Sequence, residues 1–347
     1  MAKSSQRAAQ RGERNEAGRT RQKTGATFSH EGRRPLTRQP CSRGRGCACR
    51  RQRVWHEGRI AQPTSDYQLL DSGGFQKLER FGSIVLARPC AQAVWQPARP
   101  AAWRTATATF SRESGNKWQG REKLPATWVI EVDGIAFQLS STDFGHLGIF
   151  PEQRDQWQRI AQDCAAFRTR HGRAPRVLNL FAYSGGSTLA AARAGAEVCH
   201  VDASKGMVEW ARKNATLNAL QDRPVRWIVD DVTKFLEREL RRGQRYDLLI
   251  LDPPSYGRGA KGEIFKIEND LPNLLSLLAR LFSEEPIGVL ISCHTPELTP
   301  ISLHHLLLQA FGENGTLQHG EMLLRGDAET LPVPSGSFCR WSRKAGG

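Results

Sequence analysis

The chain has 347 residues and a formal net charge of +15. This length predicts about two folded domains, since an average domain has roughly 150 residues. No apolar run approaches the roughly 18 residues that a membrane helix needs, and no apolar segment follows the basic N-terminus as it would in a secretory signal. We therefore expect no membrane partner, and the cytoplasm is the expected compartment.

Most of the positive charge lies in the first 60 residues, which contain 16 Lys and Arg against 4 Asp and Glu. The remaining 287 residues carry 34 basic and 31 acidic side chains and are close to neutral. Residues 1–62 are rich in Arg, Gln, Gly and Ser without apolar periodicity, which predicts a disordered basic tail. Such a tail either binds nucleic-acid phosphates without sequence specificity or is a solvated leader with no fixed role.

The cysteine pattern predicts no metal site. Cys41, Cys47 and Cys49 lie close together in the tail, but they lack the Cys-x2-Cys pair that is typical of structural zinc sites. The eight cysteines of an intracellular protein are expected to stay reduced.

Two regions with different patterning follow the tail. Residues 63–150 contain short β-rich runs, such as 83–87 and 126–132, separated by Gly and Pro. They predict a small β-rich domain, with room for one helix. From residue 151 a helix at 153–171 opens a regular alternation of strands and helices. The expected strands are 176–180, 197–202, 225–229, 246–252 and 287–293, and the expected helices are 187–194, 205–217, 232–242, 267–282 and 300–311.

This alternation predicts a parallel sheet covered by helices on both faces, with two closing strands at the end of the chain. In such folds, ligands bind at the carboxyl ends of the strands, where the strand order reverses. The first strand runs into Asn179-Leu-Phe-Ala-Tyr-Ser-Gly-Gly-Ser187 and then a helix. Small residues let the backbone approach a ligand, and the helix start offers free N–H groups. Ala182 and Ser184 break the Gly-x-Gly-x-x-Gly pattern, which disfavours an NAD-dependent oxidoreductase.

Acidic residues end the next two strands. Asp202 ends the second strand, and Asp230 and Asp231 follow the third. A carboxylate at the first position can accept the ribose hydroxyl hydrogens of an adenosine, and Asp231 with the Val232 backbone can serve the adenine. Each aspartate alone is more often a helix N-cap. Their occurrence at successive strand ends predicts a nucleoside-containing cofactor.

The fourth strand ends in Asp252-Pro-Pro-Ser-Tyr256. Two prolines stiffen this turn, so the Asp252 side chain and the Pro253 carbonyl are expected to be fixed acceptors. Tyr256 offers a ring on which a planar group can stack. The alternative is a structural turn without chemistry.

Together, segments 179–187, 201–204, 230–232 and 251–256 resemble the motif series of class I S-adenosylmethionine-dependent methyltransferases. The resemblance is closest to the bacterial branch that methylates large-subunit ribosomal RNA on cytosine C5 or guanine N7. Residues 145–154 resemble its Gly-x-x-Gly-[Phe/Leu]-[Phe/Tyr]-x-Asp-Gln-Arg motif, and Ile291-Ser-Cys-His294 resembles its Ser-Cys-Ser segment. The resemblance covers about residues 67–345 and implies a Rossmann-like seven-stranded methyltransferase sheet over residues 151–347.

The resemblance and the strand-end arguments together imply a set of residues that bind S-adenosylmethionine. This set comprises Gln153, Arg154, Asn179, Phe181, Ala182, Tyr183, Ser184, Gly185, Asp202, Ala203, Ser204, Asp231, Val232 and Asp252.

The expected catalytic residues are Asp252, Pro253, Tyr256 and Cys293. A base nitrogen with a lone pair needs only placement beside the methyl donor. Cytosine C5 needs a thiolate to add at C6 first, and Cys293 is the candidate for that role. The alternative is that Cys293 is a buried core residue.

An RNA methyltransferase acting on ribosomal RNA is the leading hypothesis. One alternative is a methyltransferase for a small molecule or a protein, which suits the near-neutral region after residue 60. Another is a non-catalytic RNA-binding protein with a methyltransferase-like fold, which the intact Asp252–Tyr256 segment disfavours.

Overall fold

The computed structural model describes residues 66–259, 262 and 264–344. The predicted tail, with its three cysteines, lies outside this range, so its disorder stays a prediction. The described residues all belong to one compact unit. Within the described range, every helix is too short or too polar to cross a membrane.

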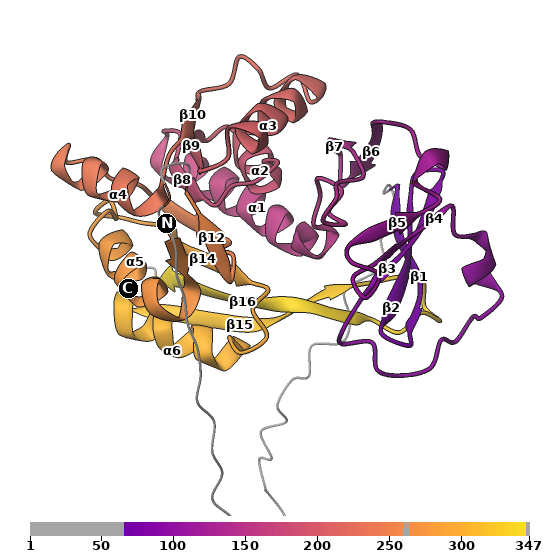
Figure 1. Ribbon diagram of the computed structural model, residues 1–347. Coiled ribbons are helices and arrows are strands. Elements are labelled where there is room, and N and C mark those ends of the chain that lie inside the picture. Colours follow the sequence, from indigo (N-terminus) through magenta and orange to yellow (C-terminus); the bar gives the residue numbers. More distant parts are fainter. Residues whose placement is uncertain (1–65, 260–261, 263, 345–347) are drawn as a thin grey trace, which may run out of the picture. The chain divides into compact units, whose positions relative to one another are not determined.

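A seven-stranded sheet organises the C-terminal part of the chain (Figure 1). Its strand order is β10–β9–β8–β11–β14–β16–β15; the first five strands are parallel, and β16 pairs in antiparallel fashion with both β14 and β15. The predicted fold class is therefore confirmed. The strands are β8 (Arg176–Leu180), β9 (Glu197–Asp202), β10 (Val225–Val229), β11 (Leu248–Leu251), β14 (Gly288–Cys293), β15 (Gly315–Leu324) and β16 (Val333–Arg343).

Helices cover both faces of this sheet because the central strands are apolar on both sides. On β14, Leu290 belongs to one core cluster, whereas Val289 and Ile291 belong to the other. The first cluster packs against α1 (Arg154–His171), α2 (Gly186–Arg193) and α3 (Lys205–Leu217). The second packs against α4 (Val232–Arg241), α5 (Ile267–Ala279) and α6 (Pro300–Phe311).

One part of the C-terminal region differs from the expected alternation. The chain forms a short hairpin of β12 (Tyr256–Arg258) and β13 (Ile264–Lys266) between β11 and α5. Each strand has three residues, too few for a period-2 pattern to be recognised in the sequence. The fourth strand is also shorter than expected, since Tyr246 makes only an isolated bridge to Phe282.

The N-terminal part is β-rich, as predicted. Its five-stranded sheet contains β1 (Tyr67–Gly73), β2 (Gln76–Phe81), β3 (Ile84–Pro89), β4 (Ala108–Ser111) and β5 (Lys117–Gln119). Up to residue 150, the described helical segments are two 3-10 turns, η1 (Ala102–Thr105) and η2 (Arg121–Lys123). A separate hairpin, β6 (Trp128–Val132) with β7 (Ile135–Leu139), bonds to α3 through backbone amides of β7 that donate to the Asn214 and Asn218 side chains. The domain boundary at residue 150 stays a prediction.

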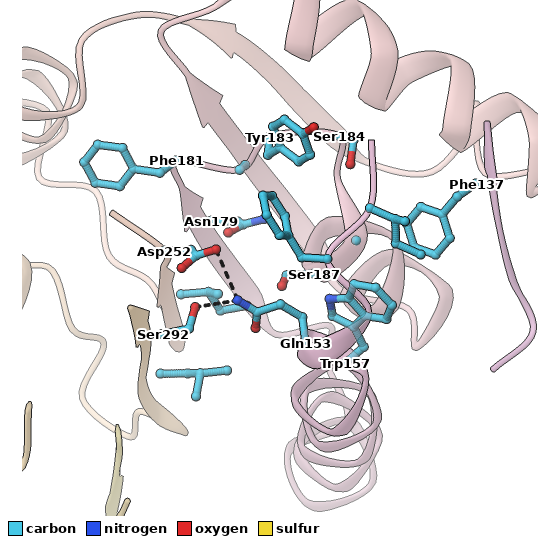
Figure 2. Close-up of a pocket in the computed structure, with 16 residues that line it drawn as sticks. Phe137, Gln153, Trp157, Asn179, Phe181, Tyr183, Ser184, Ser187, Asp252 and Ser292 are labelled. Atoms are coloured by element: carbon cyan, nitrogen blue, oxygen red, sulfur yellow. Dashed lines mark hydrogen bonds between the residues drawn. The ribbon is translucent and has the colours of Figure 1, made fainter. Parts of the chain in front are cut away.

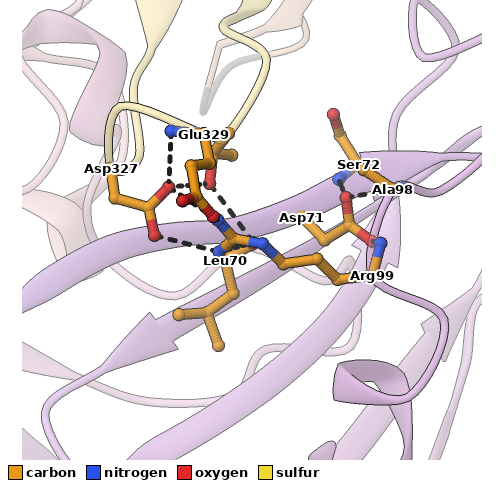
Figure 3. A network of polar contacts seen from close by, with 8 residues as sticks. Leu70, Asp71, Ser72, Ala98, Arg99, Asp327 and Glu329 are labelled. Carbon is orange, nitrogen blue, oxygen red and sulfur yellow. Dashed lines mark hydrogen bonds and ion pairs between the residues drawn. The ribbon is translucent and has the colours of Figure 1, made fainter.

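The turn between β15 and β16 bonds to Arg99, which lies in the segment between β3 and β4 (Figure 3). Arg99 donates two hydrogen bonds of 2.9 Å to Asp327 and one of 3.2 Å to Glu329. Beside it, Asp71 accepts the backbone amides of Ala98 and Arg99. These bonds hold the last two strands of the large sheet against β1. The hydrogen bonds from Arg99 also hold the pKa of Asp327 below its usual range.

Asp247 lies directly before β11, at the amino ends of the parallel strands, where it joins three segments. Its 1% exposed carboxylate accepts two hydrogen bonds from Arg173, one from the Arg176 amide and one from the Ser283 hydroxyl. Burial alone would raise the pKa of Asp247, but these four hydrogen bonds lower it below its ordinary value.

We expect Asp247→Asn to lower the free energy of unfolding by about 2 kcal/mol at pH 7, because an amide cannot accept from Arg173 on both atoms. A lowered pKa in the folded state contributes stability above the unfolded-state pKa of about 3.9, and this contribution is lost as the pH falls. Urea unfolding at pH 7 and pH 3 should therefore show a difference between the two proteins that shrinks in acid. An undiminished difference at pH 3 would contradict this account.

Candidate functional site

A cavity of about 650 Å³ opens at the carboxyl ends of β8, β9, β10 and β11. The strand order reverses between β8 and β11, so the cavity lies where this fold class binds ligands. Its lining comprises His146, Phe150, Phe181, Tyr183, Asp202, Ala203, Ser204, Asp231, Val232, Asp252, Pro253, Pro254, Gly257, Arg258, Gly259, Phe265 and His294. A smaller recess of about 40 Å³ continues inward and shares Phe150, Phe181, Tyr183 and Asp252 with it (Figure 2).

The loop after β8, whose residues Phe181 and Tyr183 line both cavities, has an unusual backbone conformation. Phe181, Tyr183 and Gly185 have positive φ angles of 53°, 49° and 95°. Two of these are aromatic residues, for which the left-handed region is strained, and such strain persists where the surrounding structure holds it. Ser184 helps to hold the loop by donating a 2.6 Å hydrogen bond to the Gly148 carbonyl.

A series of buried, hydrogen-bonded polar side chains supports this loop. The Asn179 amide donates to the Thr188 hydroxyl, which lies 2.9 Å from Nδ1 of His200. All three side chains are at most 3% exposed, and burial lowers the pKa of His200 to about 3. A neutral His200 therefore links the end of β8, the first turn of α2 and β9.

Asp202 joins the loops after β8 and β9. Its carboxylate accepts the Tyr183 amide at 2.9 Å and the Ser204 amide at 2.8 Å. Burial raises the pKa of Asp202, although the two amide bonds oppose that shift. The carboxylate lines the cavity, and its remaining lone pairs can accept the two hydroxyl hydrogens of a ribose.

Asp231 is a helix N-cap, which was the alternative interpretation of the strand-end aspartates, and Ser204 caps α3 in the same way. Both residues also line the cavity. Ser204 accepts the Met207 amide at the start of α3, and Asp231 accepts the Lys234 amide at the start of α4. Ala203 and Val232 lie beside them in the lining. The caps fix the positions of the two loops, so the two interpretations are compatible.

Gln153 connects the recess to the fourth strand. It lies at the end of the 3-10 turn η3 (Pro151–Gln153) and is 7% exposed. Its side-chain amide donates to Asp252 Oδ2 at 3.1 Å and to the Ser292 hydroxyl at 2.8 Å (Figure 2). The other Asp252 oxygen, Oδ1, is buried and accepts no hydrogen bond from the described residues. An unpaired buried acceptor beside a cavity is suited to a ligand that donates a hydrogen bond.

The other predicted site residues lie differently. Arg154 donates from its Nε to Asp133 in the β6–β7 turn at 2.7 Å and is absent from the lining of both cavities. Tyr256 is 51% exposed on β12 and also lies outside both linings, whereas Pro253 lies in the larger one. Gly185 also lies outside both linings. The roles of all the predicted site residues stay predictions.

Cys293 lies on the far side of the sheet from the cavities. It is 1% exposed and belongs to the core cluster under α5 and α6, while its neighbours Ser292 and His294 line the two cavities. Successive residues of a strand point to opposite faces, which explains the separation. Burial also raises the pKa of the Cys293 thiol, which disfavours the thiolate. The placement matches the alternative of a buried core cysteine, and the covalent role stays an untested prediction.

Eight residues of the lining were not among the predicted site residues: His146, Phe150, Pro254, Gly257, Arg258, Gly259, Phe265 and His294. Phe265 lies on the unpredicted β13, where it contacts Phe181 with a centroid distance of 5.1 Å. The signal for His294 was that it occupies the position of the last serine in the Ser-Cys-Ser segment of the resembled family. His146 and Phe150 lie within or beside the recognised 145–154 motif, but only their packing brings them to the cavity.

Gly186 at the start of α2 lies against Trp157 of α1. A Cβ atom there would lie 2.6 to 2.9 Å from three atoms of the Trp157 indole, which is itself buried against Phe137. We expect Gly186→Ala to cost about 1–3 kcal/mol through overpacking. Gly206 is a matched control at the start of α3, since its nearest neighbour would lie 3.9 Å away. Thermal unfolding should show a loss for Gly186→Ala only, and equal behaviour of the two variants would contradict the packing argument.

Residues 80–325 match the family model described as S-adenosylmethionine-dependent methyltransferase. The chain belongs to this family. Its cofactor is S-adenosylmethionine, as predicted, and its activity is methyl transfer. Asp202 and the loops that precede α3 and α4 line the larger cavity, and the assignment of individual residues to parts of the cofactor stays a prediction.

The chain is similar to ribosomal RNA methyltransferases over part of their length. It is 33% identical over 183 residues to the large subunit methyltransferase K/L of Pseudomonas paraeruginosa, covering 52% of this chain and 23% of that protein. It is 31% identical over 165 residues to the large subunit methyltransferase I of Aeromonas salmonicida, covering 47% of this chain and 39% of that protein. The chain thus spans less than half the length of these curated relatives.

A solved structure is similar over nearly its whole length. The S-adenosylmethionine-dependent methyltransferase of Agrobacterium tumefaciens superposes with a TM-score of 0.76 at 36% identity. The match covers 80% of this chain and 91% of that chain. It therefore includes both the β-rich part and the seven-stranded sheet.

Proposed function

We propose that this methyltransferase methylates a base of ribosomal RNA in the cytoplasm, with the cavity over β8 and β11 as its active site. Asp202, Ser204 and Asp231 bind the adenosine side of S-adenosylmethionine, and Gln153 orients Asp252 at the inner end. Asp252 and the Pro253 carbonyl accept hydrogen bonds from the base. The names of the two ribosomal RNA methyltransferase relatives support this substrate.

The residues of the β12–β13 hairpin are the main structural support for RNA as the substrate. Gly257 and Phe265, which are paired across the hairpin, line the cavity. Tyr256 and Lys266 form the next pair, and both are exposed. Arg258, two residues from Tyr256, donates to its hydroxyl. An exposed aromatic ring between cationic side chains is suited to a stacked nucleotide and its phosphates. A base within folded RNA must be unstacked to enter such a cavity.

The substrate class is tested by offering the full chain tritiated S-adenosylmethionine with three separate pools. These are undermodified large-subunit ribosomal RNA, bulk protein and a small-molecule extract. The proposal expects label in the RNA alone, and expects Tyr256→Ala with Lys266→Ala to weaken RNA binding while affinity for S-adenosylhomocysteine is retained. Label only in protein or small molecules would show that RNA is not the substrate. The absence of label in every pool, from a protein that binds the cofactor, would favour a non-catalytic role.

A further inference from the structure

His294 lies at the mouth of the active site between two carboxylates. Its Nδ1 lies 3.8 Å from Glu152 Oε1, and its Nε2 lies 3.8 Å from Asp252 Oδ2. The Phe150 ring packs against the imidazole with a centroid distance of 5.4 Å. His294 lines the cavity and keeps 35% of its side chain exposed, so a substrate can reach it.

The two carboxylates belong to different elements and are not paired with any Arg or Lys of the described chain. Glu152 is 5% exposed, accepts one hydrogen bond from the Ser335 hydroxyl, and leaves its Oε2 without a described partner. Asp252 likewise leaves Oδ1 without one. Each ring nitrogen of His294 therefore has a carboxylate oxygen nearby that is not already paired with an Arg or Lys of the described residues.

The backbone makes room for this histidine. Gly336 of β16 has a φ of 120°, and a Cβ atom there would lie 3.0 Å from His294 Nδ1 and 2.8 Å from the Cys293 carbonyl. Other residues would therefore press against the imidazole. Ser335, beside Gly336, is the residue that holds Glu152. The β16 strand thus supports both His294 and its acidic neighbour.

From this arrangement we propose that His294 is the general base of the reaction, and that the acceptor is an amino nitrogen of a base, which carries a hydrogen. The inference rests on the proposed RNA function. No cysteine lines either cavity among the described residues, so direct attack by nitrogen fits the site better than attack by a carbon that needs a thiolate. A ring nitrogen without hydrogen has no proton to lose and would not need His294.

The nitrogen lone pair forms a bond to the methyl carbon, and the sulfonium C–S bond breaks with its electron pair remaining on sulfur. The methylated nitrogen is then cationic, and its N–H bond breaks with the pair remaining on nitrogen. The proton passes to the Nε2 lone pair of His294, which becomes an imidazolium beside Asp252 and Glu152. Water removes that proton after the product leaves.

Single-turnover methyl transfer to ribosomal RNA by the full chain tests the inference. We expect His294→Ala to slow transfer about 10²-fold, the usual contribution of a positioned base, with affinity for S-adenosylhomocysteine retained. Added imidazole should restore part of the rate, which it would not do for a purely structural residue. His294→Gln, which keeps a polar side chain but cannot take the proton, should be equally slow and fold normally. His305→Ala, an exposed histidine on α6, should match the wild type.

Three results would overturn the inference: an unchanged rate in His294→Gln, a slow His294→Ala that imidazole does not rescue, or a product methylated on a ring nitrogen or carbon. These failures differ from failure of the proposed function, in which the wild type itself labels no RNA. If the wild type labels only another pool, the acceptor is not a base of RNA, and both the proposed function and this inference are overturned.

Discussion

Replacing Asp252 by alanine should slow methyl transfer about 10³-fold, at the upper end of the effect of removing one preorganised polar group from an active site. Asp252 lines both cavities, accepts a hydrogen bond from Gln153 on Oδ2, and has no described partner on Oδ1. Its loss removes an acceptor for the substrate and a neighbour of His294. The rate constant in single-turnover assays is the quantity to measure.

The matched control for this prediction is Asp222→Ala, which removes an exposed carboxylate outside both cavities. It should keep the wild-type rate. Asp252→Asn should lose activity as well, because its amide cannot present two acceptor oxygens. A wild-type rate in Asp252→Ala would remove this residue from the chemistry.

Asp202→Ala should raise the dissociation constant of S-adenosylhomocysteine about 100-fold. The substitution removes the ribose acceptor and leaves the amides of Tyr183 and Ser204 without their partner. An unsatisfied buried group costs about 1–3 kcal/mol, and about 1.4 kcal/mol corresponds to a factor of ten in affinity. Part of the cost falls on the free protein, so the thermal midpoint should also drop.

Calorimetric titration separates the two parts of this effect. Asp202→Asn retains one acceptor oxygen and should bind with intermediate affinity. Asp222→Ala should bind as the wild type does. Full affinity in Asp202→Ala would mean that the cofactor lies elsewhere.

The fold of residues 151–347 could be predicted because its physical signals are local. Each central strand is an apolar run, and each following helix has its own apolar periodicity and cap, as in the Ser204 and Asp231 turns. Strand ends in a parallel sheet must meet at one edge, so Asp202, Asp231 and Asp252 could be grouped without coordinates. The structure confirms that all three line one cavity.

The rest of the site depends on packing between distant segments. Phe265 reaches the cavity only because β12 and β13 pair across three residues, and short strands carry no readable period. Glu152 and His294 are more than 140 residues apart, so their approach follows from the docking of η3 on β14 and β16. For Cys293, the sequence shows that side chains alternate between the two faces of the strand, but not which of these faces is next to the cavities. That choice was decided by the helices that cover each side.

We propose that this cavity transfers a methyl group from S-adenosylmethionine to one base of large-subunit ribosomal RNA. It is tested most directly by nucleoside mass spectrometry of that RNA after incubation with the full chain and trideuteromethyl S-adenosylmethionine. The account predicts one nucleoside that carries the heavy methyl group, and its absence when Asp252→Ala replaces the wild type. RNA without any heavy nucleoside, from a wild-type protein that binds the cofactor, would contradict it.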